Sequence, residues 1–171
     1  MKNLLFSLVA ILGITIGANA QDTSFGVTAG LFNADATVKF EGEKQDVDGS
    51  TGFYIGVVGD FSITEKFGIR PELLYANIDE SSAIFIPVMA KIFVADGLHF
   101  QAGPQFGFSL EDLPEDASAF DLGLGAGLGY DFPFGLFLEG RYTFQVNNSY
   151  SGDLDITAKG KYLTFGVGYK F

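Results

Sequence analysis

The chain has 171 residues, no cysteine, a formal net charge of −11 and a mean hydropathy of +0.26. The acidic charge excludes a nucleic-acid-binding protein, which needs basic patches, and the lack of cysteine excludes a fold that depends on disulfides. No stretch after the N-terminal segment is apolar enough for a membrane helix, so the apolar average favours strands in which hydrophobic residues alternate with others.

The first twenty residues form a predicted secretory signal peptide. Lys2 gives a basic start, residues 4–16 are an apolar run, and Ala18 and Ala20 make an A-x-A cleavage site before Gln21. The apolar run is too short to cross a membrane, which distinguishes it from an anchor. We therefore predict cleavage after residue 20 and one domain over residues 21–171.

From residue 24 onward, apolar residues recur at every second position in eight separate stretches. This period of two is typical of strands with one apolar face and one small or polar face. We predict strands over residues 24–32, 51–61, 67–77, 83–94, 98–109, 119–131, 136–146 and 161–171. Eight is an even number and the size of the smallest common barrel, so the predicted fold class is all-β, an eight-stranded antiparallel up-and-down transmembrane β-barrel. Its last strand must pair with its first, which removes both open edges.

The connections between these stretches alternate between long and short. With both termini in the periplasm, the long connections face outside, which is the outer-membrane pattern. They carry nearly all of the net negative charge and cover residues 33–50, 78–82, 110–118 and 147–158. Ala36, Val38 and Phe40 alternate weakly within the first of them, which allows the first strand to project beyond the membrane.

Three prolines, Pro71, Pro87 and Pro104, lie inside predicted strands. Proline cannot donate a hydrogen bond to a neighbouring strand. We therefore expect bulges or irregular pairing near these positions. The four glycines on the inward face of residues 119–131 are expected to leave room for bulky groups opposite, because the interior of an eight-stranded barrel is narrow.

Charged side chains share the face opposite the large apolar residues. Five are predicted near mid-barrel, and these are Arg70, Glu72, Lys91, Glu139 and Arg141. Asp60, Asp121 and Asp131 are predicted nearer the ends of the barrel. Two hypotheses follow, a salt-bridge and hydrogen-bond plug that fills the lumen, or the gate of a small pore. We favour the plug, because side chains fill an eight-stranded barrel and unpaired buried charge is very unfavourable.

Neither catalysis nor metal binding is expected from the remaining polar residues. His99, the one histidine, is predicted to face inward near a periplasmic turn and so lacks the position of a catalytic base. Asp153 with Asp155, and the loop acids Glu111, Asp112, Glu115 and Asp116, lack the spacing of a calcium-binding loop. We expect these acids to be solvated, and we expect no enzyme activity and no cofactor.

Several short motifs resemble the small outer-membrane β-barrel family of Bacteroidetes, which is similar to PorT-like proteins and to the OmpA and OmpX barrels. They are TGFYIG at 51–56, RPELLY at 70–75, IPVMAK at 86–91, QAGPQFG at 101–107, EGRY at 139–142 and the terminal Phe171. The resemblance implies an outer-membrane location and recognition of the last strand by the barrel-insertion machinery. That assembly signal is expected to comprise Phe165, Val167, Tyr169 and Phe171.

The resulting functional hypothesis is a monomeric outer-membrane barrel with a structural or surface-interaction role. Its partners are then the lipid and lipopolysaccharide around it and an extracellular molecule bound through the acidic loops. The alternative is a narrow channel or small-solute porin. A soluble barrel with a ligand in its lumen and a lipid-modifying enzyme are less expected.

Overall fold

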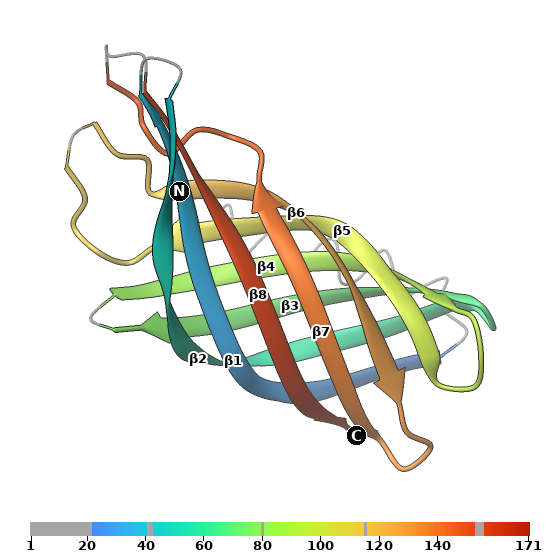
Figure 1. Cartoon of the computed structure of the whole chain (residues 1–171). Helices are drawn as coiled ribbons and strands as arrows, with labels where there is room; N and C mark the ends of the chain where they lie inside the picture. The colour runs from blue at the N-terminus through green and yellow to red at the C-terminus, as the bar shows by residue number, and fades with distance from the viewer. Residues whose placement is uncertain (1–21, 41–42, 80, 115, 153–155) are drawn as a thin grey trace.

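The computed structural model describes residues 22–40, 43–79, 81–114, 116–152 and 156–171, and within these ranges it contains eight strands. Consecutive strands pair antiparallel, and the first pairs with the last, so the sheet closes into a barrel (Figure 1). The strands are β1 Asp22–Phe40, β2 Glu43–Thr64, β3 Phe67–Ile78, β4 Ser81–Phe93, β5 Leu98–Ser109, β6 Phe120–Asp131, β7 Leu136–Gln145 and β8 Ile156–Lys170. Among the described residues there is no helix long and apolar enough to cross a membrane.

The alternation of the sequence fixes which side chains face out. Large apolar side chains are exposed on the outer wall of the strands, for example Phe25, Ile55, Leu73, Phe100, Leu128 and Phe165. The residues between them point into the lumen, and the buried ones include glycines, polar and charged side chains, and a smaller set of large apolar side chains such as Phe32, Leu74 and Phe85. Phe61 shares the outward side of β2 by its position but is only 3% exposed, because its ring covers Gly59 and meets the edge of Phe25.

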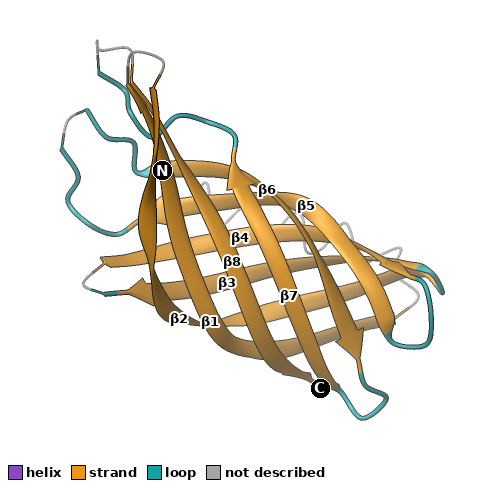
Figure 2. Cartoon of the chain, in the orientation of Figure 1, coloured by secondary structure: helices purple, strands orange, loops and turns teal. Residues whose placement is uncertain are grey.

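The first hairpin is longer than the predicted loop of residues 33–50 allowed. β1 continues to Phe40, β2 begins at Glu43, and β8 begins at Ile156 and pairs with β1 over the same length. These three strands rise beyond the rest of the barrel wall (Figures 1 and 2). The register of β1 and β2 shifts between Ala34 and Ala36, because residues 48 and 49 of β2 both lie opposite Asp35 of β1. This extra residue interrupts the period of two in β2.

The expected bulges near the prolines are absent from the described strand pairs, whereas the expected irregular pairing is present, because pairs are missing beside Pro71 and Pro87 without a shift of register. β3 pairs Pro71 with Val88 and, three residues later on each strand, Leu74 with Phe85, so the register is the same on both sides of the interruption. β4 and β5 keep one register on both sides of the Pro87–Gln105 pair. The only register shifts among the described strand pairs lie in β1–β2 and at the turn end of β2–β3. Proline therefore interrupts hydrogen bonding locally without displacing the neighbouring strand.

The opposite end of the barrel has short turns. Gly97 and Gly135 adopt φ angles of 76° and 95°, which side chains with a Cβ rarely adopt. Gly97 also accepts a hydrogen bond from the backbone of Asp131, and Gly135 accepts one from Lys170. The two glycines thus close their hairpins and join them to neighbouring strands.

Candidate functional site

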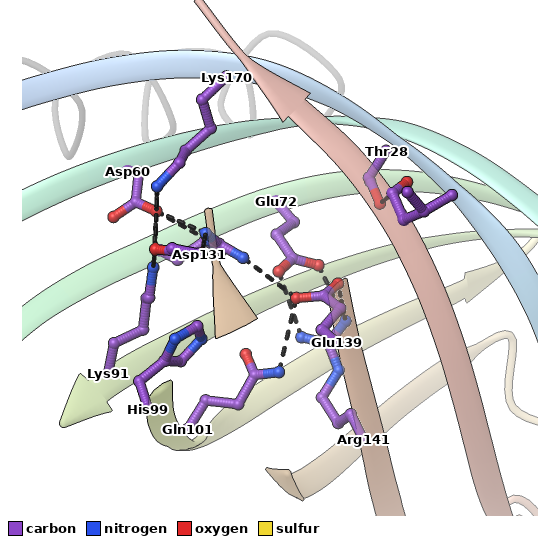
Figure 3. A network of polar contacts seen from close by, with 12 residues as sticks. Thr28, Asp60, Glu72, Lys91, His99, Gln101, Asp131, Glu139, Arg141 and Lys170 are labelled. Atoms are coloured by element: carbon purple, nitrogen blue, oxygen red, sulfur yellow. Dashed lines mark hydrogen bonds and ion pairs between the residues drawn. The ribbon is translucent and has the colours of Figure 1, made fainter. Parts of the chain in front are cut away.

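The lumen holds a network of charged side chains that comes from six different strands (Figure 3). Each charge lies at an inward position of the alternating pattern, so the sheet itself directs it to the barrel axis. The four basic members are Arg70, Lys91, Arg141 and Lys170, and the four acidic members are Asp60, Glu72, Asp131 and Glu139.

One half of the network lies toward the short turns and is centred on two aspartates. Asp60 accepts hydrogen bonds from Arg70 Nη2 at 2.6 Å and from Lys91 Nζ at 2.8 Å. Asp131 accepts from Lys91 Nζ at 2.7 Å and from Lys170 Nζ at 2.9 Å. Lys170 comes from the closing strand, so this cluster connects β8 to β2, β4 and β6 across the lumen.

The other half of the network contains two glutamates and Arg141. Arg141 donates from both terminal nitrogens to Glu72, at 2.9 Å and 3.4 Å, and lies 3.8 Å from Glu139. Arg70 donates to Glu139 at 3.2 Å and so joins the two halves. Gln101 also donates to Glu139, at 3.5 Å. The arrangement leaves no member of the set of eight without an oppositely charged partner.

The network is balanced in charge and removed from solvent. Four basic and four acidic side chains give a formal sum of zero, and the side chains of Arg70, Lys91 and Arg141 are completely buried. A buried charge without a partner is strongly destabilising, by about 3–5 kcal/mol when one member of a pair is removed. The equal numbers therefore explain how so many charges can share a narrow lumen.

An apolar layer lies between the charges and the outer mouth. Phe32 stacks on Phe85 with ring centroids 4.8 Å apart, and Tyr162 lies against both rings at 5.5 Å and 5.4 Å. Leu74 and Tyr54 belong to the same buried cluster. Tyr162 donates a short hydrogen bond to Asp121, a predicted inward acid that lies outside the charge network. The lumen is thus occupied by side chains at both levels.

Glycines make room for the largest of these side chains. A Cβ at Gly166 would collide with the Tyr54 hydroxyl, and a Cβ at Gly129 would collide with the His99 ring. Gly125 likewise faces Met89 and Thr143. For the glycines of residues 119–131, Gly125 and Gly129 agree with the expectation that they leave room for bulky groups, whereas a Cβ at Gly127 would meet the backbone of Gly140.

The five interior charges predicted from the sequence all belong to the network, and Asp60 and Asp131 join them. Lys170 was missed as a member, although its even-numbered position in β8 puts it on the inward face with Thr164 and Gly168. Which carboxylate each base meets depends on register and depth in the barrel, which the alternation alone does not give.

The remaining predicted residues lie elsewhere. The proposed assembly residues Phe165, Val167, Tyr169 and Phe171 are exposed on the outer wall of β8 and at the C-terminus. His99 is buried against Phe93 and near the carbonyl oxygen of Gly97, at 3.3 Å from Nδ1. The cleavage residues Ala18 and Ala20, and the acids Glu115, Asp153 and Asp155, lie outside the described residues.

The acids Glu111, Asp112 and Asp116 are exposed. No group of three or more histidine, cysteine or acidic residues is placed to hold a metal ion within the described part of the chain. Glu111 instead accepts a hydrogen bond from the backbone of Ser82 at 2.9 Å, which ties its loop to β4.

Comparison with known proteins gives one family and a set of similar folds. A family model described as "Outer membrane protein beta-barrel domain" matches residues 6–171. The attachment invasion locus protein Ail of Yersinia pestis superposes with a TM-score of 0.51 at 17% identity, covering 88% of this chain and 100% of Ail. Neisserial surface protein A gives 0.50 at 16% identity, with coverage of 88% and 100%. Comparison with curated protein sequences gives no significant match.

Proposed function

This chain belongs to the outer membrane protein β-barrel family and is located in the outer membrane, and from that premise we propose that its barrel is closed to solutes and that it acts through its outer surface. Within the family, the motifs at 51–56, 70–75, 86–91, 101–107 and 139–142 favour the small Bacteroidetes-type, PorT-like barrels. The chain is proposed to be a monomer without enzymatic activity. A soluble barrel with an apolar ligand inside would be polar outside and apolar within. Here the outer wall exposes large apolar side chains and the lumen holds the charges, which argues against such a barrel.

The observation that carries this proposal is the balanced interior network. Each of its eight charges is already partnered by another side chain, so none is left to attract a passing ion. The stacked Phe32 and Phe85 rings add an apolar barrier at a second level. A barrel filled in this way serves as a rigid stem for the segments above the membrane.

Those segments are long and acidic. The apolar outer face of β1 ends at Leu31, while the strand continues to Phe40. At about 3.3 Å per residue, the nine residues from 32 to 40 extend roughly 30 Å along the strand beyond the apolar band. The negative charge lies mainly in these outer segments, which favours contact with a basic molecule or with cations bound to lipopolysaccharide.

A narrow channel is the second candidate. It is favoured by buried polar atoms in the lumen that have no partner among the described residues, including Gln101 Oε1, Gln105 Nε2 and Arg141 Nε. Such atoms are usually satisfied by water. The aromatic layer of Phe32, Phe85 and Tyr162 argues against a continuous water path from these atoms to the outer mouth.

Liposome swelling tests closure to solutes. Vesicles containing the purified full chain are placed in iso-osmotic arabinose, with protein-free vesicles and porin-containing vesicles as the two references. The proposal predicts that vesicles containing the full chain swell no faster than the protein-free vesicles. Swelling that increases with the amount of protein would favour the channel.

A trimmed hairpin tests the surface role. Replacing residues 37–46 by Asn-Gly leaves the Ala36–Val47 pair at the end of a two-residue turn. A strain with the trimmed chain should match the deletion strain in adhesion and match the wild type in detergent sensitivity. Equal adhesion of the trimmed and wild-type strains would show that the outer hairpin has no such role.

A further inference from the structure

The seam between β1 and β8 is the one strand pair that no turn of the chain joins. Each of the other neighbouring pairs among the described strands is consecutive in the sequence, whereas β1 and β8 come from the two ends of the described chain. Their ladder runs from the Gly26–Lys170 pair to the Phe40–Ile156 pair without a register shift. Backbone groups released by opening of this seam would meet lipid, which offers no hydrogen bonds. Contacts that hold the two sides of the seam together therefore matter for closure of the wall.

β1 itself places only small side chains in the lower part of the lumen. Its inward residues between positions 24 and 30 are Ser24, Gly26, Thr28 and Gly30. None of the eight charges of the interior network lies on this strand. A Cβ at Gly26 or at Gly30 would also collide with carbonyl oxygens of the β8 backbone. The lumen side of β1 is thus low enough for side chains of both neighbouring strands to pass over it.

Tyr54 passes over β1 from β2. Gly30 of β1 pairs with Tyr54 on one side and with Gly166 of β8 on the other, so the three residues form one row across the seam. The Tyr54 ring lies over Gly30, with its Cε1 2.8 Å from the position of an added Cβ, and its hydroxyl reaches the position of a Cβ on Gly166. Tyr54 is completely buried, and its hydroxyl has no hydrogen-bond partner within the described part of the chain. The contact is therefore one of packing, and it depends on a glycine in each of the two strands that the ring covers.

Lys170 passes over β1 in the other direction, from β8. Its partner in the β1 ladder is Gly26, which has no side chain to block the path. Lys170 Nζ lies 3.4 Å from Asp60 Oδ2 on β2 and 2.9 Å from Asp131 Oδ2 on β6 (Figure 3). Because Lys170 and Asp60 lie on the two neighbours of β1, their ion pair spans two strand spacings, roughly 10 Å.

We propose that Tyr54 and Lys170 form a clasp that joins β2 to β8 across β1 and holds the seam of the barrel closed. The two contacts lie four residues apart along β1, at Gly30 and Gly26, which corresponds to about 13 Å. One is apolar and the other ionic, and separation of β8 from β1 must break both. The clasp acts against sideways opening of the wall, which is distinct from closure of the lumen to solutes and from any role of the outer segments.

Hydrogen exchange of the full chain in detergent micelles, followed by NMR, measures opening of the seam. Alternate amides of a strand bond to the neighbours on its two sides, so the β1 amides that bond to β8 can be followed separately from those that bond to β2. The quantity compared is the exchange rate of the β1–β8 amides divided by that of the β3–β4 amides in the same sample. A uniform loss of global stability leaves this ratio unchanged, whereas local opening of the seam raises it.

Loss of either contact should raise this exchange ratio. Tyr54→Leu should raise it by at least about tenfold, because the ring no longer reaches β8, and mainly around residues 29–31. Lys170→Met should raise it by about three- to tenfold, mainly around residues 25–27, because the ion pair across β1 is lost. The two variants therefore act at different places along one seam.

Lys91→Met is the matched control for the ionic contact. Lys91 binds the same two aspartates, at 2.8 Å from Asp60 and 2.7 Å from Asp131, but it comes from β4 and does not pass over β1. This variant should lower the overall stability, because the Lys91 side chain is completely buried, and should leave the exchange ratio within about twofold of the wild type. Met89→Ala, a truncation of a buried β4 side chain, is the corresponding control for Tyr54→Leu.

An unchanged exchange ratio in either Tyr54→Leu or Lys170→Met would overturn the proposal. An equal rise in the two control variants would overturn it as well, since the seam would then respond to any loss inside the lumen. If Tyr54→Leu does not fold, Lys170→Met decides the question together with Lys170→Arg. The arginine variant keeps the charge and the reach across β1, so it should keep the wild-type ratio, and a ratio as high as that of Lys170→Met would contradict the clasp.

Discussion

The Arg141–Glu72 pair offers the sharpest test of charge balance in the lumen. Both side chains are completely buried, and two hydrogen bonds of 2.9 Å and 3.4 Å join them. The test compares Arg141→Met, Glu72→Leu and the double variant. Each single variant leaves four charges of one sign and three of the other, whereas the double variant restores three of each.

The expected free energies follow from this count. Removing one partner of a buried pair costs about 3–5 kcal/mol, because the other charge stays buried without compensation. Replacing both partners by apolar side chains is often neutral or stabilising. We therefore expect each single variant to lose about 3–5 kcal/mol of unfolding free energy and the double variant to lie within about 1 kcal/mol of the wild type.

The assay has to avoid tryptophan fluorescence, because the chain contains no tryptophan. Urea unfolding in detergent micelles can instead be followed by heat-modifiable gel migration, which separates folded from unfolded barrels. Lys66→Met, in the exposed turn after β2, is the matched control and should leave the midpoint unchanged. A double variant that loses the sum of both single losses would refute charge balance as the reason for the pairing.

Three further outcomes are expected. Lys170→Met should lower the unfolding free energy by about 1–2 kcal/mol, an amount reduced by screening at its 18% exposed side chain, as measured by the same gel assay. Gly166→Ala should lose about 1–3 kcal/mol through collision with the Tyr54 hydroxyl, and adding Tyr54→Phe should restore most of the loss; no rescue would show that the collision is not the cause. Deleting Phe171 should lower the outer-membrane yield of folded barrel, whereas Phe171→Tyr should not; equal yields would contradict an assembly role for the terminal aromatic.

The barrel itself was predictable because its pattern is redundant. Each of the eight stretches alternates by itself, and β6, where Leu122, Leu124 and Leu128 alternate with glycines, does so most strictly. Each strand has large apolar residues on one face and charged or small residues on the other, so only the apolar face can meet the lipid. The predicted side-chain directions therefore held even near the prolines, where bulges or irregular pairing were expected.

The extended hairpin was not fully predictable, for two physical reasons. A bulge at residues 48 and 49 of β2, opposite Asp35, interrupts the period of two in that strand, whereas β1 keeps one register with β8 from Gly26 to Phe40. Above the membrane both faces of a strand meet water, so selection for an apolar face ends there. The weak alternation of Ala36 and Val38 was the only remaining signal.

The sequence also did not predict which charged side chains pair with each other. Asp60 and Arg70 are ten residues apart, but Arg70 and Glu139 are 69 residues apart and meet across the lumen. Their contact depends on strand tilt and on how far each side chain reaches toward the axis. A sequence pattern assigns a residue to the lumen, and only the closed barrel assigns its partner.

Single-channel recording tests the central claim most directly. The purified full chain is inserted into a planar bilayer, insertion is verified by recovering heat-modifiable protein, and the current is recorded at fixed voltage in symmetric salt. A lumen filled by balanced charges and the Phe32–Phe85 layer predicts no steady current above the bare bilayer. A stable open conductance of the wild-type protein that scales with salt concentration would contradict it.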